Sequence, residues 1–358
     1  MKILHTGYMH YIPGSIKQQL ESELTMSVGL ANSVEWDVAF FSNDLISLGD
    51  WHHKLNAYGR AIDYFNLRIR FYYWLFRVSK DYDCVLLRWP AGDLFTLLLI
   101  LLNNNIYTIH HTFEIKEVSL RKGRIGKLKS FIEKHLSVSS LKKARGIIGV
   151  TGEIVDYELN RVSQIKPTFV YPNGFDISSR EITIDKRNGA PVFLMIATEF
   201  SPWQGLELVI DELKVISELF EFHVIGNVSD SQIKRGNGDE RFVFHGMRDS
   251  GFINEVMGKV DVGIAAYRLD LKGMKQACSL KVRDYLAAGV PVYSGHADAT
   301  IPDNFPYYIN KELNPHELID FAKQVRSVPR QKVREESEKY IDKRIYFKAL
   351  TDWLLVNQ

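Results

Sequence analysis

Hydrophobic and polar positions alternate along the first half of the chain in a way that predicts a parallel sheet. Short apolar runs of strand length are separated by longer segments whose apolar residues recur at helical spacing. Strands are predicted at residues 2–6, 36–41, 82–87, 106–110 and 146–150, and helices after Gly14 and at residues 56–79, 93–102 and 125–144. Strands that alternate with helices form a parallel sheet with helices on both faces.

The alternation restarts in the second half, after a polar, glycine-containing stretch at residues 178–189. Strands are predicted at residues 192–196, 222–225, 242–244, 262–265 and 290–293, and helices at residues 205–219 and 331–357. We therefore expect an α/β protein with Rossmann-like domains at residues 1–172 and 173–335. A C-terminal helix, 336–358, is expected to pack back toward the N-terminal domain. Ligands of such sheets bind at the carboxyl ends of the strands, so the expected site is a cleft that the two domains face across.

Composition and charge favour a folded two-domain protein and argue against nucleic-acid-binding, disulfide-rich and membrane-spanning classes. The 358 residues are 46% hydrophobic and 25% charged, enough for two folded domains, and the net charge of +2 does not predict nucleic-acid binding. Two cysteines, Cys84 and Cys278, are too few for a disulfide framework or a metal cluster and fit a reducing compartment. The N-terminus has the pattern of a first buried strand rather than a secretion signal, and no apolar run reaches the ~20 residues of a membrane-spanning helix. We expect a cytoplasmic protein.

The strongest local pattern is the segment at residues 275–293, which reads KQACSLKVRDYLAAGVPVY. Ser279 is placed to cap a helix that Gly289 ends, and the free N–H groups of a helix start attract phosphate. Lys281 and Asp284 lie three apart on one helical face, which offers a cation for a phosphate and a carboxylate for ribose hydroxyls. A surface ion pair on an amphipathic helix explains the same spacing. The preceding loop contains Lys272, Gly273 and Lys275, which could complete an anion-binding site at this helix start.

Several segments resemble, in the same order, those of GT-B retaining glycosyltransferases of family 4, the glycosyl transferases group 1. The matching segments are FVYPNGFD (169–176), FLMIATEFSPWQGLELVI (193–210), FHVIGN (222–227), FVFHGM (242–247) and the segment at residues 275–293. The match is closest to bacterial members that build surface or capsular polysaccharide. The resemblance implies a GT-B fold and transfer of a sugar, of hexosyltransferase type, from a nucleotide diphosphate sugar to a lipid-linked glycan acceptor. It also implies retention of anomeric configuration and no bound metal.

The resemblance also assigns roles to residues of the donor site. The family carries two glutamates eight residues apart, one near the transferred sugar and one on the ribose, and Gln276 and Asp284 occupy these places. An arginine and a lysine that contact donor phosphates in the family correspond to Glu199 and Gln204, so Lys281 is the substitute cation. The residues expected to bind the donor are Gly14, Ser15, Asn173, Glu199, Trp203, Gln204, Gly205, Ser279, Leu280, Lys281 and Asp284.

Two of these places have ordinary structural explanations. Gly14 and Ser15 precede a helix, where the family has a glycine-bearing loop that meets phosphate, but a plain helix cap explains them as well. Asn173 and Gly174 follow a strand, where a turn that needs positive φ explains them without any ligand. The resemblance adds that this turn lines the interdomain cleft.

In the first half, polar side chains end two otherwise apolar strands. His110 matches the strand-end histidine of the family and is expected near the transferred sugar, in a catalytic set with Lys281 and Gln276. A buried, satisfied histidine is the alternative, and His111 is the exposed one if the register shifts by one. Arg88, His111 and Glu117 are expected on the acceptor side, although a solvated loop explains Glu117 equally well. No H-x-x-x-H or C-x-x-C pattern predicts a metal site.

Two basic stretches rich in apolar residues, 55–80 and 121–145, bear on partners. They predict peripheral contact with an anionic membrane, at the inner face of the plasma membrane, where a lipid-linked acceptor would be met. Core packing explains most of the aromatic residues in the first stretch equally well.

Two other functions remain open on the sequence. A noncatalytic GT-B subunit that supports a catalytic partner is suggested by Gln276, Glu199 and Gln204, where the family has charged residues of other kinds. A GT-B sugar-nucleotide epimerase fits the fold. The absence of G-x-G-x-x-G and Walker A patterns argues against a dehydrogenase and a P-loop ATPase.

Overall fold

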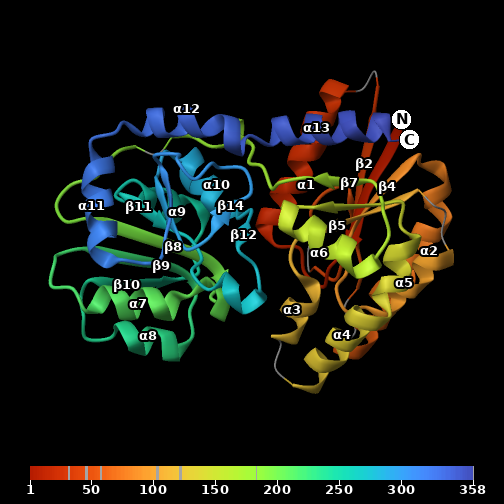
Figure 1. Ribbon diagram of the computed structural model, residues 1–358, viewed down its shortest axis with the longest axis horizontal. Helices are drawn as coiled ribbons and strands as arrows, with labels where there is room; N and C mark the ends of the chain where they lie inside the picture. Colours follow the sequence, from red (N-terminus) through yellow and green to blue (C-terminus); the bar gives the residue numbers. More distant parts are fainter. Residues whose placement is uncertain are drawn as a thin grey trace. The chain divides into compact units, whose positions relative to one another are not determined.

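The computed structural model describes residues 1–30, 33–44, 47–56, 59–101, 105–120, 123–182 and 184–357. The chain divides into two compact units, and Figure 1 shows the elements of each. The first unit consists of Met1–Pro172 and Arg344–Gln358, and the second consists of Asn173–Lys343. Parts of five predicted segments lie outside the described residues, namely Ala57, Tyr58, Leu102, Arg121, Lys122, Thr183 and Gln358.

The first unit is built on a seven-stranded parallel sheet in the order β3-β2-β1-β4-β5-β6-β7. Its strands are β1 (Lys2–Tyr8), β2 (Glu35–Ser42), β3 (His52–Lys54), β4 (Cys84–Arg88), β5 (Ile106–His110), β6 (Gly146–Gly149) and β7 (Thr168–Val170). The five predicted strands are confirmed. The strand expected before Asn173 is β7, whereas the edge strand β3 was missed because it has three residues and no apolar run.

Helices cover this sheet, and neighbouring strand residues feed two separate cores. Ile3 packs with Trp36 and Phe40 on one face, whereas Leu4 packs with Phe71 and Leu75 on the other. The helical elements are α1 (Gly14–Ser27), η1 (Val28–Leu30), α2 (Arg60–Val78), η2 (Ser79–Asp81), η3 (Leu94–Leu101), α3 (Glu114–Ser119), α4 (Arg124–His135), α5 (Ser137–Lys143), α6 (Gly152–Val162) and α13 (Lys343–Val356).

Two helix predictions in this unit were wrong in detail. The segment predicted as an α-helix at residues 93–102 forms the 3-10 helix η3. The helix predicted at residues 125–144 is divided at Leu136 into α4 and α5.

The second unit has a six-stranded parallel sheet in the order β10-β9-β8-β11-β13-β15, with a separate pair, β12-β14. The strands are β8 (Val192–Glu199), β9 (Glu221–Asn227), β10 (Phe242–Gly246), β11 (Val262–Ile264), β12 (Gln276–Ala277), β13 (Val292–Ser294), β14 (Ala297–Asp298) and β15 (Tyr308–Asn310). The helical elements are η4 (Ile177–Ser179), η5 (Pro202–Gln204), α7 (Leu206–Lys214), α8 (Asp230–Gly236), α9 (Ser250–Met257), η6 (Leu269–Lys272), α10 (Leu280–Ala287), α11 (Pro315–Arg326) and α12 (Arg330–Ile341). The predicted helix at residues 205–219 therefore ends earlier, at Lys214.

The single C-terminal helix predicted at residues 331–357 is two helices, because Asp342 leaves the helical conformation with ψ 120°. The first of them, α12, packs in the core of the second unit through Val333 and Ile341. The second, α13, supplies Phe347 to the core of the first unit, where its ring lies 4.7 Å from that of Trp36. In Figure 1 the blue helix α13 accordingly lies among the red and orange elements of the first unit. Among the described residues of the predicted segment 336–358, Phe347, Leu350 and Leu354 of α13 belong to the core of the first unit, whereas Ile341 of α12 belongs to the core of the second.

Within the described ranges, no helix combines the length and the apolar character needed to cross a membrane.

Candidate functional site

The helix start predicted at Ser279 forms in the second unit. Ser279 is the N-cap of α10, and Gly289, with φ +77°, directly follows the last turn of that helix. Within the described part of the chain the Ser279 side chain makes no capping hydrogen bond. Because α10 is followed by a tight turn into the parallel strand β13, its N-terminus lies at the edge where the strands end. Leu280 is the first residue of this helix.

Lys281 and Asp284 share one face of α10, as predicted. The Lys281 Nζ lies 3.9 Å from Asp284 Oδ2, and the two side chains are 37% and 17% exposed. The other carboxylate oxygen, Oδ1, lies 3.5 Å from Nη2 of Arg180. These distances are those of ion pairs rather than tight hydrogen bonds. Arg180 was missed, since it is far from α10 in sequence and no local pattern connects the two.

Gln276 lies on β12, where it pairs with Ala297 of β14, and its side chain is half-buried. Two residues later, Cys278 contacts Asn173: the Asn173 backbone N lies 3.0 Å from Cys278 Sγ, and Asn173 Nδ2 donates to the Cys278 carbonyl at 2.8 Å. Asn173 is thus fixed to the segment that leads into α10.

The expected positive φ at Gly174 is wrong. Gly174 is not among the glycines with positive φ in the described residues. A Cβ at this position would lie 2.3 Å from Lys343 Cα, so glycine is required here by close backbone approach.

A buried ion pair supports the start of α10. Arg283 is completely buried and donates to both oxygens of Asp298, with Nη2 at 2.7 Å from Oδ1. Its Nη2 also donates to Thr300 Oγ1 at 2.8 Å, and its Nε donates to the Asn173 carbonyl at 2.9 Å. Arg283 therefore connects Asn173, the β12-β14 pair and α10. Sequence reasoning missed it, because an arginine on an amphipathic helix is expected in solvent.

The segment after β8 holds four more predicted donor residues. Glu199 ends β8 and is exposed, and Gln204 forms a capping box with Ser201, so the amide of Gln204 is used locally. The half-buried ring of Trp203 lies 4.4 Å from the Nζ of Lys272, which is 9% exposed. Gly205, with φ +75°, adopts a conformation that favours glycine.

In the first unit, Gly14 and Ser15 open α1 and are both exposed. A Cβ at Gly14 would have no heavy atom within 4 Å among the described residues. The start of α1 is therefore open to solvent, but neither residue caps the helix, since the N-cap is Pro13 and no side-chain capping hydrogen bond is made among the described residues.

The predicted acceptor-side residues come together at the carboxyl ends of β4 and β5. Arg88 Nη1 lies 2.7 Å from His111 Nε2, so this nitrogen accepts the hydrogen bond and the imidazole is neutral in this arrangement. Burial lowers the pKa of Arg88 to about 10, and the charge of Glu117 opposes that shift more than those of Glu23 and Glu114 do. Arg88, His111 and Glu117 thus form one charged group.

His110 is buried among side chains of the first unit. Its side chain is completely buried, with Nδ1 3.1 Å from Glu114 Oε1 and Nε2 3.0 Å from Thr108 Oγ1. Its ring stacks on Trp89 at 5.4 Å between centroids. His110 is thus buried and hydrogen-bonded, as the alternative interpretation expected, and its contact with a sugar stays a prediction.

A buried acidic network surrounds His110. Arg161 joins two of its carboxylates, Glu158 and Glu133: its Nη1 lies 2.7 Å from Glu158 Oε2 and its Nη2 lies 2.8 Å from Glu133 Oε1. Burial raises the pKa of Glu114 and of Glu158 to about 8. Ligand atoms of His110, Glu114 and Glu158 lie within 4.8 Å of one another, the one such trio in the described ranges. Protonation of the carboxyls and the positive charge of Arg161 explain how these acidic side chains can be buried together as a hydrogen-bonded part of the core.

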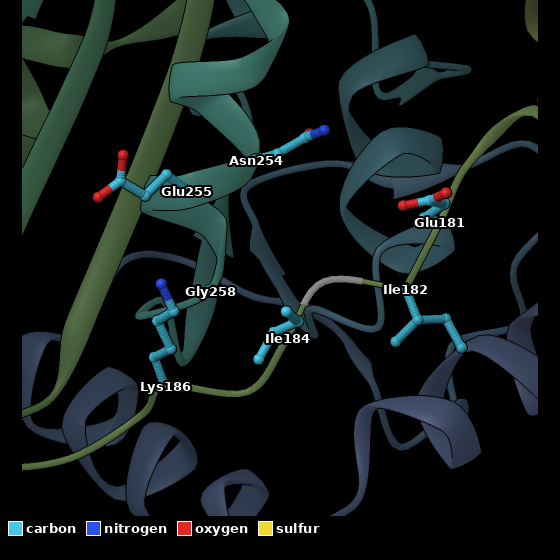
Figure 2. Close-up of a pocket in the computed structure, with 7 residues that line it drawn as sticks. All are labelled: Glu181, Ile182, Ile184, Lys186, Asn254, Glu255 and Gly258. Atoms are coloured by element: carbon cyan, nitrogen blue, oxygen red, sulfur yellow. The ribbon is translucent and has the colours of Figure 1, made fainter.

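The second unit also has a pocket of about 250 Å³ between the segment that leads into β8 and α9. Figure 2 shows its lining side chains, among which Lys186 and Glu255 lie to one side and Ile182 to the other. None of the predicted donor residues lines it. One of its lining residues, Asn254, accepts a hydrogen bond from Arg180 at 2.5 Å, so the pocket lies close to the Arg180–Asp284 pair.

Comparisons with known proteins show the fold. No protein-family model matches the chain, and no curated protein matches it in sequence. Among solved structures, the lipopolysaccharide outer core galactosyltransferase WaaB is similar over 100% of both chains, with a TM-score of 0.66 and 13% identity. Sucrose-phosphate synthase from Thermosynechococcus elongatus is similar over 100% of both chains, with a TM-score of 0.68 and 14% identity. Anabaena HepE in complex with UDP and glucose is similar over 99% of this chain and 100% of that one, with a TM-score of 0.66 and 13% identity. The chain therefore has the GT-B fold of glycosyltransferases, with two Rossmann-like units.

Proposed function

We propose that the protein is a retaining glycosyltransferase that transfers a sugar from a nucleotide diphosphate sugar to a glycan acceptor. One observation carries the proposal: Lys281, Asp284 and the start of α10 lie together at the carboxyl edge of a Rossmann-like sheet. This is where such sheets bind nucleotides. The structures named above include a galactosyltransferase and a protein bound to UDP and glucose, which supports the same chemistry here.

The donor is proposed to bind to the second unit. Lys281 and the N–H groups at the start of α10 neutralise the leaving diphosphate, because charge that develops on the leaving group must be stabilised during transfer. Asp284 accepts hydrogen bonds from the ribose hydroxyls, and Arg180 orients its carboxylate. Gln276 is proposed to contact the donor sugar.

The acceptor is proposed to contact the first unit through Arg88, His111 and Glu117. His111, neutral while it accepts from Arg88, is proposed to contact the acceptor together with Arg88 and Glu117. His110 has no role in this proposal beyond the buried network. We place the reaction in the biosynthesis of bacterial surface polysaccharide, in the cytoplasm, with a lipid-linked acceptor and without a bound metal.

Calorimetry with a panel of nucleotide diphosphate sugars tests donor binding. We expect one donor to bind the wild-type protein, and Asp284→Asn and Lys281→Met each to weaken binding by about 10- to 100-fold, the loss of one charge-assisted contact. The matched control is Lys234→Met, at an exposed lysine of α8. Wild-type affinity in both site variants would refute the assignment.

The transfer step is tested separately with the donor found in this way. Incubation with a pool of lipid-linked glycans, read by mass spectrometry, should show a product heavier by one sugar residue. Asp284→Asn and Lys281→Met should lower its rate of formation, whereas Lys234→Met should not.

A noncatalytic subunit is the second candidate. It is favoured by Glu199, a carboxylate exposed at the end of β8, and by Gln204, whose amide is used within its own capping box. Neither side chain supplies a cation for phosphate. Failure to bind every nucleotide sugar, together with increased transfer by a co-purified glycosyltransferase, would establish this role. Conversion of a donor without any acceptor would instead indicate an epimerase.

A further inference from the structure

Helix α2 carries a row of large apolar side chains that the first unit does not bury. Ile62, Phe65, Ile69, Tyr73 and Phe76 recur every three or four residues, the spacing of one helical face. Each is between 46% and 63% exposed. Isolated apolar residues at a surface need no explanation, but a continuous row on one helix indicates a contact surface.

The 3-10 helix η3 lies beside this row and turns it into a groove. Ile69, Tyr73 and Phe76 on α2, with Leu98 and Leu101 on η3, line a groove of about 340 Å³, floored by Tyr72 and Phe95. The Tyr72 and Phe95 rings stack with centroids 6.4 Å apart. An ion pair also holds the two sides of the groove together. Arg68 Nε on α2 lies 2.7 Å from Oδ2 of Asp93, the residue directly before η3.

Helix α4 extends the same surface. Its Lys129 Nζ lies 5.9 Å from the ring centre of Tyr64 on α2. Ile125, Leu128 and Phe131 on α4 are between 57% and 72% exposed. The exposed side chains of α2, η3 and α4 named so far are called the apolar face below.

The charges on this face have one sign. The exposed basic residues include Arg70 and Arg77 on α2 and Arg124, Lys127 and Lys134 on α4. The only acidic residue in the sequence of α2, Asp63, is 4% exposed, and the only one in α4, Glu133, is fully buried. The apolar face therefore exposes apolar and cationic side chains to solvent. The carboxylates of these two helices are buried.

We infer that the apolar face docks on an anionic phospholipid bilayer and that the groove between α2 and η3 takes one acyl chain from it. The exposed aromatic and aliphatic residues match the acyl region of such a bilayer, and the flanking arginine and lysine residues match its anionic head groups. A second copy of the chain fits poorly, because a twofold contact would place these cations against themselves. The inference deepens the proposed function by naming what carries the acceptor, but vesicle binding needs neither donor nor transfer.

Flotation with vesicles tests the bilayer contact. We expect the full chain to float with vesicles of phosphatidylcholine and about one third phosphatidylglycerol, and not with phosphatidylcholine alone. Ile69→Asp with Phe76→Asp should abolish flotation, and Arg70→Gln with Arg77→Gln should weaken it about 10- to 30-fold. Matched controls are Val215→Asp with Leu219→Asp, 78% and 77% exposed in the second unit, and Lys234→Gln. No flotation of the wild type, or equal loss in the controls, would overturn the inference.

A probe in the groove tests the acyl chain. Both native cysteines, Cys84 and Cys278, are buried, so Leu98→Cys can be labelled selectively with an environment-sensitive fluorophore. We expect a blue shift on binding anionic vesicles and quenching by lipids brominated in the acyl chain, with neither at a labelled Leu219→Cys. An unshifted probe on floating protein would overturn the groove assignment. A dimer by sedimentation that Ile69→Asp dissociates would replace the bilayer with a second copy. Either result would leave donor binding unaffected, so it is distinguishable from failure of the proposed function.

Discussion

At the scale of single residues, the most consequential side chains are charged and buried, which is the opposite of what the sequence favours. Arg283, His110 and Glu158 all have no exposed surface. Each is stable there because it meets a partner from another element: Arg283 meets Asp298, and His110 and Glu158 belong to the network with Glu114. Arg283 and Asp298 are 15 residues apart and leave no local pattern, so their pairing could not be predicted, whereas a buried His110 was one of the two interpretations of the sequence.

The Arg283–Asp298 pair gives a stability prediction. Asp298→Asn should lower the free energy of unfolding of the second unit by about 3–5 kcal/mol, because it leaves a buried guanidinium without its counter-charge. Replacing both partners, with Arg283→Met and Asp298→Leu, should cost less than the sum of the single changes. Urea denaturation of the wild type, Arg283→Met, Asp298→Leu and the double variant measures the coupling. Additive costs would show that the pair is not coupled.

The Glu114 and Glu158 carboxyls give a pH prediction. Their pKa is about 8 in the folded protein and about 4.3 in an unfolded chain. Between these two pH values the folded protein therefore keeps protons on both carboxyls, whereas the unfolded chain has released them. This contribution to stability is complete below about pH 4 and is lost as the pH rises through about 8. The melting temperature of the first unit should therefore fall over that range.

Glu114→Gln separates this effect from others. The amide keeps the size of the side chain but cannot ionise, so the slope of melting temperature against pH should flatten. Glu21→Gln, at a side chain 46% exposed on α1, is the control and should leave the slope unchanged. A slope equal to that of the wild type in Glu114→Gln would contradict the assignment.

At the scale of elements, periodicity predicted what local sequence controls. The strands that fill the middle of each sheet were found, because their continuous apolar runs reflect burial on both faces. The start and end of α10 were found from Ser279 and Gly289. The short edge strand β3 and the 3-10 conformation of η3 depend on neighbours in space and were missed.

Glycines at element ends show the same division. Gly289 and Gly205 have positive φ, a local requirement that their positions at helix ends indicate. Gly174 has none, and its reason is Lys343, a residue far along the chain. The helix start at Ser279 and the shared face of Lys281 and Asp284 could accordingly be predicted, whereas the pairing of Arg180 with Asp284 could not.

At the scale of the whole molecule, α13 completes the core of the first unit from the other end of the sequence. Phe347→Ala should lower the free energy of unfolding of the first unit by about 3–5 kcal/mol, the usual cost of removing a buried phenyl ring. The loss of stability should appear in the first unit alone. Hydrogen exchange, resolved along the chain at increasing denaturant concentration, measures the stability of each unit. Leu355→Ala, 37% exposed on the same helix, is the control. Equal protection losses in both units would contradict this assignment.

The split of the first unit between Met1–Pro172 and Arg344–Gln358 has a consequence during synthesis. A ribosome that has released Lys343 has delivered all of the second unit but has not yet delivered α13. The second unit can then close its core while the first still lacks Phe347, Leu350 and Leu354, whose places beside Ile3 and Trp36 stay unfilled. The part of the chain made first is thus the part finished last, and until then its apolar surface is available to chaperones.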